Sequence, residues 1–247
     1  MSAIYIAVPC YGGLITMRCA KSIMQTCIYS ERRKDVDVVC LFTEGESLVQ
    51  RARNQLVHQF LCISKPGDHL LFVDADLEFD PEWVFMLHAA KRDVVGLAYP
   101  RKRIEWDDVK GAEDPQMAAA SYFIHPEEAD GKPVQVDNGC IPVRWLGTGF
   151  MMMSRECLLA MAIEHSNTAH ISDSFGSAGE IVHALFDCAI DEKDGIYLSE
   201  DYLFCKRWRD MGNKVWMGLW GSPSHIGSHT FRGNLGKLVA PAKQVAT

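Results

Sequence analysis

The sequence lacks most of the short motifs that identify a protein class directly. It contains neither the G-x-x-x-x-G-K-[ST] pattern of phosphate-binding loops nor the G-x-G-x-x-G pattern of dinucleotide-binding folds. The G-x-S-x-G pattern around the nucleophile of many serine hydrolases is missing as well. The usual P-loop, dinucleotide-binding and serine-hydrolase classes therefore have no support.

Long apolar runs are missing too. No stretch approaches the ~20 residues that a membrane-spanning helix needs. The chain passes from Met1 almost directly into a strand-like run at residues 4–8, with no basic leader before an apolar stretch, so we expect no signal peptide. These features predict a soluble, cytoplasmic protein without a membrane span.

The cysteine pattern excludes the common cysteine-based scaffolds. The count is odd, no C-x-x-C pair occurs, and several cysteines lie inside apolar segments. This favours buried free thiols in a reducing compartment over a structural zinc site or a disulfide framework. The nine positions are Cys10, Cys19, Cys27, Cys40, Cys62, Cys140, Cys157, Cys188 and Cys205.

Positive charge is scarce: 25 lysines and arginines face 32 aspartates and glutamates, for a formal net charge of -7. No global basic field is present to hold a polyanion, so a nucleic-acid partner is not favoured, although a local basic patch could still support one. Hydrophobic residues make up 48% and charged residues 23% of the 247 positions. These values are typical of a globular enzyme with one large domain.

Short apolar runs alternate with amphipathic segments along the first hundred residues. Because strands that alternate with helices pair in parallel, the pattern predicts an α/β fold with a mainly parallel central sheet and helices on both faces. Strands are expected at residues 4–8, 36–42, 70–73, 94–98, 149–154 and 214–220, and helices at residues 14–29, 47–63, 80–90, 155–165 and 199–211. Ser47, Asp80 and Ser199 are the expected helix caps. Residues 166–179 are expected to form a long loop.

The sharpest feature is Asp74-Ala75-Asp76, directly after the apolar run at residues 70–73. Side chains alternate along an extended chain, so acids two positions apart point the same way. The carboxyl ends of parallel strands are where α/β sheets bind ligands. Two carboxylates there can hold a divalent cation such as Mg²⁺, with water and phosphate oxygens completing its coordination. The simpler alternative is that the acids only end the strand and cap the next helix.

Asp74-Ala75-Asp76 resembles the D-x-D motif of GT-A glycosyltransferases, in which a metal ion bridges the donor diphosphate to the protein. Further segments resemble the same family in order, over about residues 3–233. They are Ile6-Ala7-Val8-Pro9-Cys10-Tyr11-Gly12, Arg51-Ala52-Arg53-Asn54, Trp145-Leu146-Gly147-Thr148-Gly149-Phe150-Met151, Ser199-Glu200-Asp201-Tyr202, and His225-Ile226-Gly227 with Phe231-Arg232-Gly233.

The resemblance assigns roles to individual residues. It implies that Pro9, Tyr11, Arg53, Asp74 and Gly149 bind the nucleotide-sugar donor. The metal ligands that it implies are Asp74, Asp76 and His225, and the acid pair near the reacting sugar is Glu200 and Asp201. It also implies a GT-A, Rossmann-like single domain over residues 1–247. About residues 1–100 would bind the nucleotide, about 101–235 would bind the acceptor, and 236–247 would be a tail.

Each assignment has a simpler alternative. Glu200 and Asp201 follow Ser199, so they could be ordinary first-turn acids that the helix dipole stabilises. Imidazole is a common ligand for transition metals, but His225 and His229 both lie in a glycine-rich segment, and only one of them is expected to bind a metal. A guanidinium binds phosphate in a forked manner. Arg53 is preferred for this role over the cluster at residues 101–103.

The sequence therefore predicts a glycosyltransferase that uses Mn²⁺ or Mg²⁺ and moves a sugar from a nucleoside-diphosphate sugar to an acceptor hydroxyl. Asp201 is the preferred general base, in an inverting scheme, and a retaining outcome stays open. A sugar nucleotidyltransferase and a non-catalytic nucleotide-sugar-binding subunit are the alternatives. The acceptor is open between carbohydrate, lipid-linked sugar, protein and modified nucleobase. Small viral and phage glycosyltransferases have the same compact form. The glycine-rich segment at residues 221–236 is expected to close over the donor.

Overall fold

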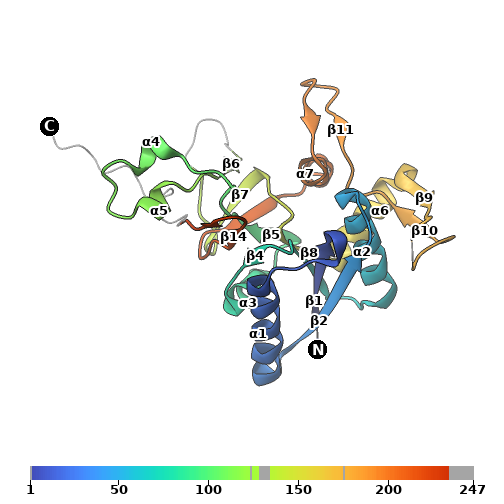
Figure 1. Ribbon diagram of the computed structural model, residues 1–247. Helices are drawn as coiled ribbons and strands as arrows, with labels where there is room; N and C mark the ends of the chain where they lie inside the picture. The colour runs from blue at the N-terminus through green and yellow to red at the C-terminus, as the bar shows by residue number, and fades with distance from the viewer. Residues whose placement is uncertain (1, 123, 128–133, 175, 234–247) are drawn as a thin grey trace.

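The computed structural model describes residues 2–122, 124–127, 134–174 and 176–233. Its centre is an eight-stranded sheet with the strand order β2-β1-β3-β8-β5-β13-β7-β6 (Figure 1). The strands of this sheet are β1 (Ser2–Cys10), β2 (Val36–Glu44), β3 (His69–Val73), β5 (Val94–Leu97), β6 (His125–Pro126), β7 (Cys140–Trp145), β8 (Phe150–Ser154) and β13 (Val215–Gly218).

The remaining elements cover or extend this sheet. The longer helices are α1 (Met17–Arg33), α2 (Val49–Ile63), α3 (Pro81–Ala89), α6 (Arg155–Glu164) and α7 (Glu200–Asp210). The short helices are η1 (Tyr11–Gly13), α4 (Trp106–Val109), α5 (Pro115–Ala118) and η2 (Ser166–Thr168). The small sheets are formed by β4 (Leu77–Glu78) with β14 (Ser224–Ile226) and β15 (Thr230–Phe231), by β9 (Ala169–Ile171) with β10 (Ile181–His183), and by β11 (Ala189–Ile190) with β12 (Tyr197–Leu198).

The central sheet is mixed rather than uniformly parallel. The pairs β1–β2, β1–β3 and β5–β13 are parallel, whereas β3–β8, β5–β8, β7–β13 and β6–β7 are antiparallel. The five strands β2, β1, β3, β5 and β13 still run in one direction, as the sequence predicted. The expected parallel sheet is interrupted because β8 lies between β3 and β5 in the opposite direction. Beyond β13, β7 also pairs in the antiparallel sense, and β6 forms the edge.

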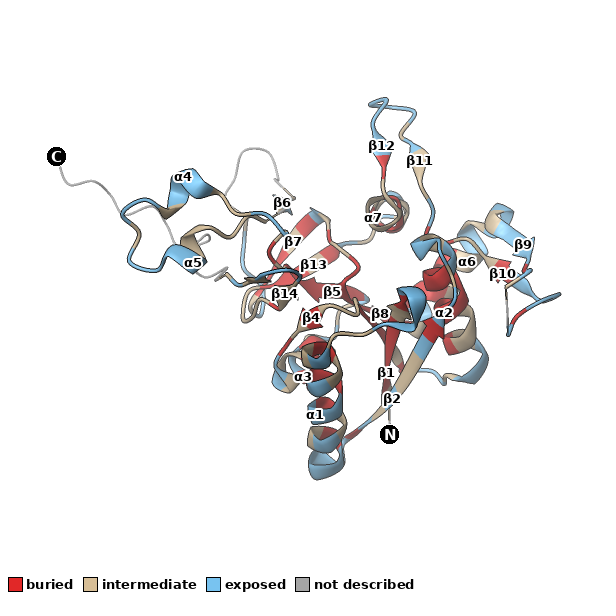
Figure 2. Ribbon diagram, in the orientation of Figure 1, coloured by how far each residue is buried: buried red, intermediate tan, exposed pale blue. Residues whose placement is uncertain are grey.

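Alternating side chains of the strands form a separate core on each face of the sheet. In β1, Tyr5 and Ala7 pack with α2, α6 and α7, whereas Ile4, Ile6 and Val8 pack with α1 and α3. Figure 2 shows the buried residues concentrated along these strands and on the inner sides of the helices. Residues 151–153, three methionines in β8, are completely buried, and they alternate between the two cores. Helices on both faces, as predicted, follow from this period of two.

The N-cap residues of the helices agree with two of the cap predictions and contradict the third. Asp80 caps α3 as expected, and its carboxylate accepts a hydrogen bond of 2.9 Å from the Glu82 amide. Ser199 is the N-cap residue of α7, but its hydroxyl donates to Asp201 rather than capping a backbone amide. The capping-box prediction at Ser47 is wrong, because α2 begins at Val49 and its N-cap residue is Leu48.

Other local predictions change where tertiary pairing supplies the missing partners. Part of the loop expected at residues 166–179 forms β9, which pairs with β10 as an antiparallel ribbon. β7 was not expected, and its sequence CIPVRW contains Pro142, a residue that argues against a strand. All nine cysteines are free, as predicted. No helix among the described residues has the length and apolar character to cross a bilayer.

Candidate active site

Two segments meet at the carboxyl end of β3. Because β8 runs antiparallel beside β3, its first residue, Phe150, pairs with Val73. Gly149 therefore lies next to Asp74, whose amide donates a hydrogen bond of 2.9 Å to the Gly149 carbonyl. A β-carbon on Gly149 would lie 2.4 Å from Tyr99 Oη and 2.6 Å from Asp74 Oδ2. Among the common residues only glycine fits between these two side chains without moving them.

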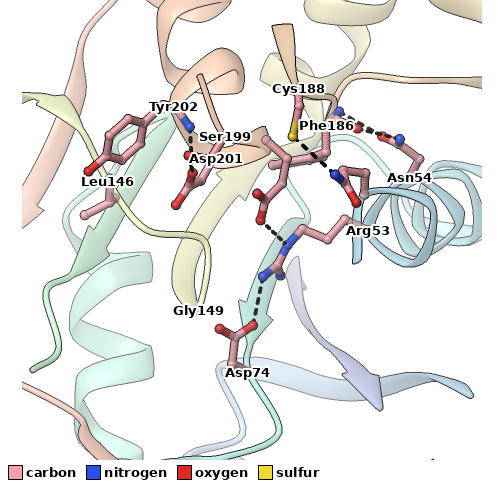
Figure 3. A network of polar contacts seen from close by, with 12 residues as sticks. Arg53, Asn54, Asp74, Leu146, Gly149, Phe186, Cys188, Ser199, Asp201 and Tyr202 are labelled. Atoms are coloured by element: carbon pink, nitrogen blue, oxygen red, sulfur yellow. Dashed lines mark hydrogen bonds and ion pairs between the residues drawn. The ribbon is translucent and has the colours of Figure 1, made fainter. Parts of the chain in front are cut away.

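Arg53 lies between two acids from distant parts of the chain. Its side chain, only 4% exposed, extends from α2 so that Nη2 donates to Asp74 Oδ1 at 2.9 Å (Figure 3). Nε lies 3.4 Å from Glu200 Oε1. Burial lowers the pKa of Arg53, but the two carboxylates outweigh it and raise the pKa above its ordinary value. The remaining nitrogen, Nη1, is buried and has no hydrogen-bond partner among the described residues.

Asp76 and His225 face each other across a pair of short strands. β14 pairs with β4 in a register that places His225 opposite Leu77, and the Ile226 amide donates a hydrogen bond of 2.8 Å to the Asp76 carbonyl. As a result, His225 Nε2 lies 3.4 Å from Asp76 Oδ1. The other oxygen of Asp76, Oδ2, forms an ion pair with the Lys102 ammonium.

The main chain fixes the orientation of the His225 ring. Nδ1 lies 2.9 Å from the carbonyl oxygen of Pro100, which can only accept, so Nδ1 carries a proton and Nε2 faces Asp76. Tyr99 contacts the imidazole edge-on, with 5.4 Å between the ring centroids. Burial would raise the pKa of Asp76, but His225 and Lys102 outweigh it and lower the pKa below its ordinary value. Asp76 is therefore an anion held next to an imidazole.

The spacing of Asp76 and His225 suits two neighbouring ligands of one divalent cation. Ligands at ~2.1 Å from an ion in octahedral geometry lie about 3 Å apart, close to the 3.4 Å between Oδ1 and Nε2. Asp74 is engaged by Arg53, and in the described part of the chain no three His, Cys, Asp or Glu side chains gather closely enough to hold a metal unaided. Such a site would be completed by substrate oxygens and water, as is usual for Mg²⁺ at phosphate sites.

One cleft of about 610 Å³ brings together most of the predicted donor-binding residues. Its walls come from the end of β1 with η1, the end of β2, the start of α2, the segment after β3, and β14. Six of the residues assigned from the sequence line it: Pro9, Tyr11, Arg53, Asp74, Asp76 and His225. Thr43 also lines it, and its hydroxyl is buried without a hydrogen-bond partner in the described chain. Thr43 and Arg53, two residues of the cleft wall, therefore each have a buried polar atom without a hydrogen-bond partner in the described chain.

A second cavity of about 340 Å³ shares His225 with this cleft and contains Asp201. Asp201 Oδ1 accepts hydrogen bonds from the Ser199 hydroxyl and from the Tyr202 amide, the latter at 2.9 Å. Burial, and then the neighbouring charge of Glu200, raise the pKa of Asp201 above its ordinary value. The two adjacent acids are thus separated: Glu200 pairs with Arg53, and Asp201 faces the second cavity.

Two residues of the site were missed or ranked too low from sequence. Tyr99 is partly buried, accepts a hydrogen bond of 3.1 Å from the Gly149 amide, and lines the second cavity. Its position directly after β5 at the carboxyl end of the sheet was the available signal. Lys102, ranked below Arg53, contacts Asp76 itself. Gly149 is part of the site through its contacts with Asp74 and Tyr99.

The described part of the glycine-rich segment, up to residue 233, is attached to the site. β14 pairs with both β15 and β4, so opening this hairpin would break its hydrogen bonds with the strand that follows Asp76. Residues 234–236 of the predicted lid, and the predicted tail at 236–247, lie outside the described residues.

No known protein family matches this sequence, and no curated protein matches it significantly. Among solved structures, A197 from STIV is similar over 95% of each chain, at 16% identity and a TM-score of 0.44. The 4-diphosphocytidyl-2C-methyl-D-erythritol synthase of Anaerococcus prevotii covers 85% of this chain and 99% of its own, at 13% identity and a TM-score of 0.34. Another structure of a synthase of that name covers 68% and 86%, at 14% identity and a TM-score of 0.32. These likenesses are too distant to assign an activity.

Proposed function

We propose that this chain is a glycosyltransferase that moves a sugar from a nucleoside-diphosphate sugar to an acceptor hydroxyl, with a divalent metal ion at Asp76 and His225. The observation that carries the proposal is the shared cleft. Residues that the sequence assigned to the donor or to the metal come from four separate segments, and they line one cavity. The proposed base lies in a second cavity that adjoins the first at His225.

The charges of the cleft favour a metal cofactor. Glu46, Asp74 and Asp76 line it, and among the described residues of its wall Arg53 is the one arginine or lysine. Arg53 is already paired with two carboxylates. A diphosphate adds further negative charge beside these carboxylates, so a cation that comes with it would favour its binding. Bound Mn²⁺ or Mg²⁺ would stabilise the negative charge on the departing diphosphate.

The two acids of α7 can then take different roles. Glu200 keeps Arg53 in place, and Arg53 in turn holds Asp74. Asp201 would accept the proton of the acceptor hydroxyl through Oδ2, because Oδ1 already accepts two hydrogen bonds. Its raised pKa makes it a stronger base than an ordinary carboxylate. An acceptor in the second cavity would attack from the side of Asp201, which suits inversion.

A nucleotidyltransferase is the less favoured alternative. Such an enzyme usually needs a basic, glycine-bearing loop after the first strand to bind a triphosphate. Here Pro9-Cys10 ends β1 and Tyr11-Gly12-Gly13 follows it, without a basic residue. The adjoining wall of the cleft contains the exposed Tyr11 and Leu14. These apolar side chains are better suited to contact a nucleobase than a triphosphate.

The test is calorimetric binding of nucleoside diphosphates with and without Mn²⁺, together with a screen of nucleotide sugars for Mn²⁺-dependent release of the diphosphate. Asp76→Asn should lose the metal-dependent binding. Asp74→Asn should weaken it less, because an asparagine oxygen can still accept from Arg53. Glu46→Gln is the matched control, since Glu46 lines the same cleft but pairs with Arg51 at 2.9 Å. Undiminished Mn²⁺-dependent affinity in Asp76→Asn would contradict the metal assignment.

A further inference from the structure

Lys102 already places a cation at the proposed metal site. Its ammonium forms an ion pair with Asp76 Oδ2, and His225 Nε2 faces the other oxygen, Oδ1, at 3.4 Å. The carboxylate therefore lies between a positive charge and an imidazole, which is the electrostatic environment that a bound metal ion would also provide. Lys102 belongs to the segment after β5, and its side chain is 41% exposed.

The Lys102 side chain has room to leave Asp76. It lines the second cavity together with Asp201 and Tyr99, and its ammonium reaches Asp76, which lines the first cleft. Its Cδ and Cε lie 3.4 and 3.6 Å from the position that a β-carbon of Gly227 would occupy, so no side chain crowds it from that side. An ammonium on a flexible four-carbon stem can turn away without moving the backbone.

We propose that Lys102 and the divalent cation compete for Asp76, so that Lys102 neutralises this carboxylate until the metal replaces it. The inference rests on the proposed function only for the choice of metal site. On metal binding the ammonium is released close to the same cleft, where it can bind the diphosphate that arrives with the metal. Lys102 is therefore a positioning residue that couples metal binding to diphosphate binding.

The experiment measures Mn²⁺ affinity alone, without nucleotide, by calorimetry and by the rise in melting temperature on Mn²⁺ addition. Lys102→Met keeps the length of the side chain and removes its charge. A partly exposed ion pair contributes ~0.2–1 kcal/mol, so loss of the competitor should tighten Mn²⁺ binding about 1.5- to 5-fold. Mn²⁺ should also raise the melting temperature of Lys102→Met more than that of the wild type.

Arg103→Met is the matched control, because Arg103 is the next residue and pairs with Glu105 at 2.9 Å instead. Its Mn²⁺ affinity should equal that of the wild type. Equal or weaker Mn²⁺ binding by Lys102→Met, or no Mn²⁺ binding by either protein, would overturn the competition. The proposed function fails by a separate result, the absence of nucleotide-sugar turnover, so the two failures can be distinguished.

If the competition holds, the second step has its own readout. With Mn²⁺ at saturation, Lys102→Met should bind a nucleoside diphosphate more weakly than the wild type does, although it binds the metal more tightly. Opposite signs for the two ligands would be hard to explain by a loss of stability, which weakens both. Unchanged or tighter diphosphate binding would contradict the release of Lys102 toward the diphosphate.

Discussion

Gly149 and Asp74 are joined by a backbone hydrogen bond of 2.9 Å, and the space where a β-carbon of Gly149 would project is already filled by Asp74 Oδ2, 2.6 Å away, and by Tyr99 Oη. Because Gly149 has no side chain, Asp74 and Tyr99 can both occupy the space beside it. Both groups are on strand ends, which cannot move apart without disturbing the sheet.

Gly149→Ala should consequently displace Asp74 or Tyr99. Overpacking of this kind costs roughly 1–3 kcal/mol of folding free energy, and nucleoside diphosphate binding should fall with it. Gly227→Ala is the control for folding stability alone, because its β-carbon would meet the flexible stem of Lys102 at 3.4 Å and the His229 carbonyl oxygen at 3.7 Å, which are ordinary contact distances. Denaturant unfolding and calorimetry measure the two effects. Normal diphosphate binding by Gly149→Ala would show that Asp74 does not need this position.

Arg53→Met should be among the most destabilising substitutions in the site. It leaves Asp74 and Glu200 without their shared cation, and removal of one partner of a buried ion pair costs about 3 kcal/mol or more. Arg53→Lys should recover only part of this, because one ammonium cannot reproduce the planar fork. Arg51 lies on the same helix, and its side chain is 45% exposed. Arg51→Met breaks its pairs with Glu46 and Asp173 and a hydrogen bond to Ser174 and should cost less than about 1 kcal/mol. Urea unfolding provides the comparison, and similar losses for the two methionine variants would be inconsistent with a buried role for Arg53.

Asp201→Asn should keep donor affinity and lose transfer by about 10²- to 10⁴-fold, the usual contribution of a general base. Because burial raises the pKa of Asp201, the wild-type rate should increase with pH through a value above the ordinary carboxyl range. This limb of the pH profile should disappear in Asp201→Asn. Glu200→Gln is the control and should retain it. Exchange of these behaviours would make Glu200 the base.

The same substitution should stabilise the fold at neutral pH. The native pKa of Asp201 is raised, so between the unfolded and native pKa values the native state binds more protons, and stability falls as pH rises. Asp201→Asn removes this cost. Its melting temperature should exceed that of the wild type at neutral pH, and the difference should vanish below the unfolded carboxyl pKa. Asp210→Asn, at the exposed end of α7 and paired with Lys206, should give no such gain.

The sequence by itself determined the elements whose signal is local. Continuous apolar runs at residues 4–8 and 151–153 indicate strands buried on both faces, because successive side chains point in opposite directions. Asp80 with Pro81 marks a helix start because both residues suit the first turn. Asp74 and Asp76 were recognisable because they follow a buried strand directly. These signals depend on neighbours a few positions away.

Only the tertiary structure decided which distant residues meet. Arg53 and Glu200 are 147 positions apart, and nothing in either segment indicates that a helix from one half binds an acid from the other. β8 lies between β3 and β5. Several apolar strands of similar length could fill this position, and the local sequence does not say which of them does. That choice placed Gly149 against Asp74 and Tyr99. Likewise, the pairing of β14 with β4 brought His225 to Asp76, because register between distant strands is set by packing and not by local sequence.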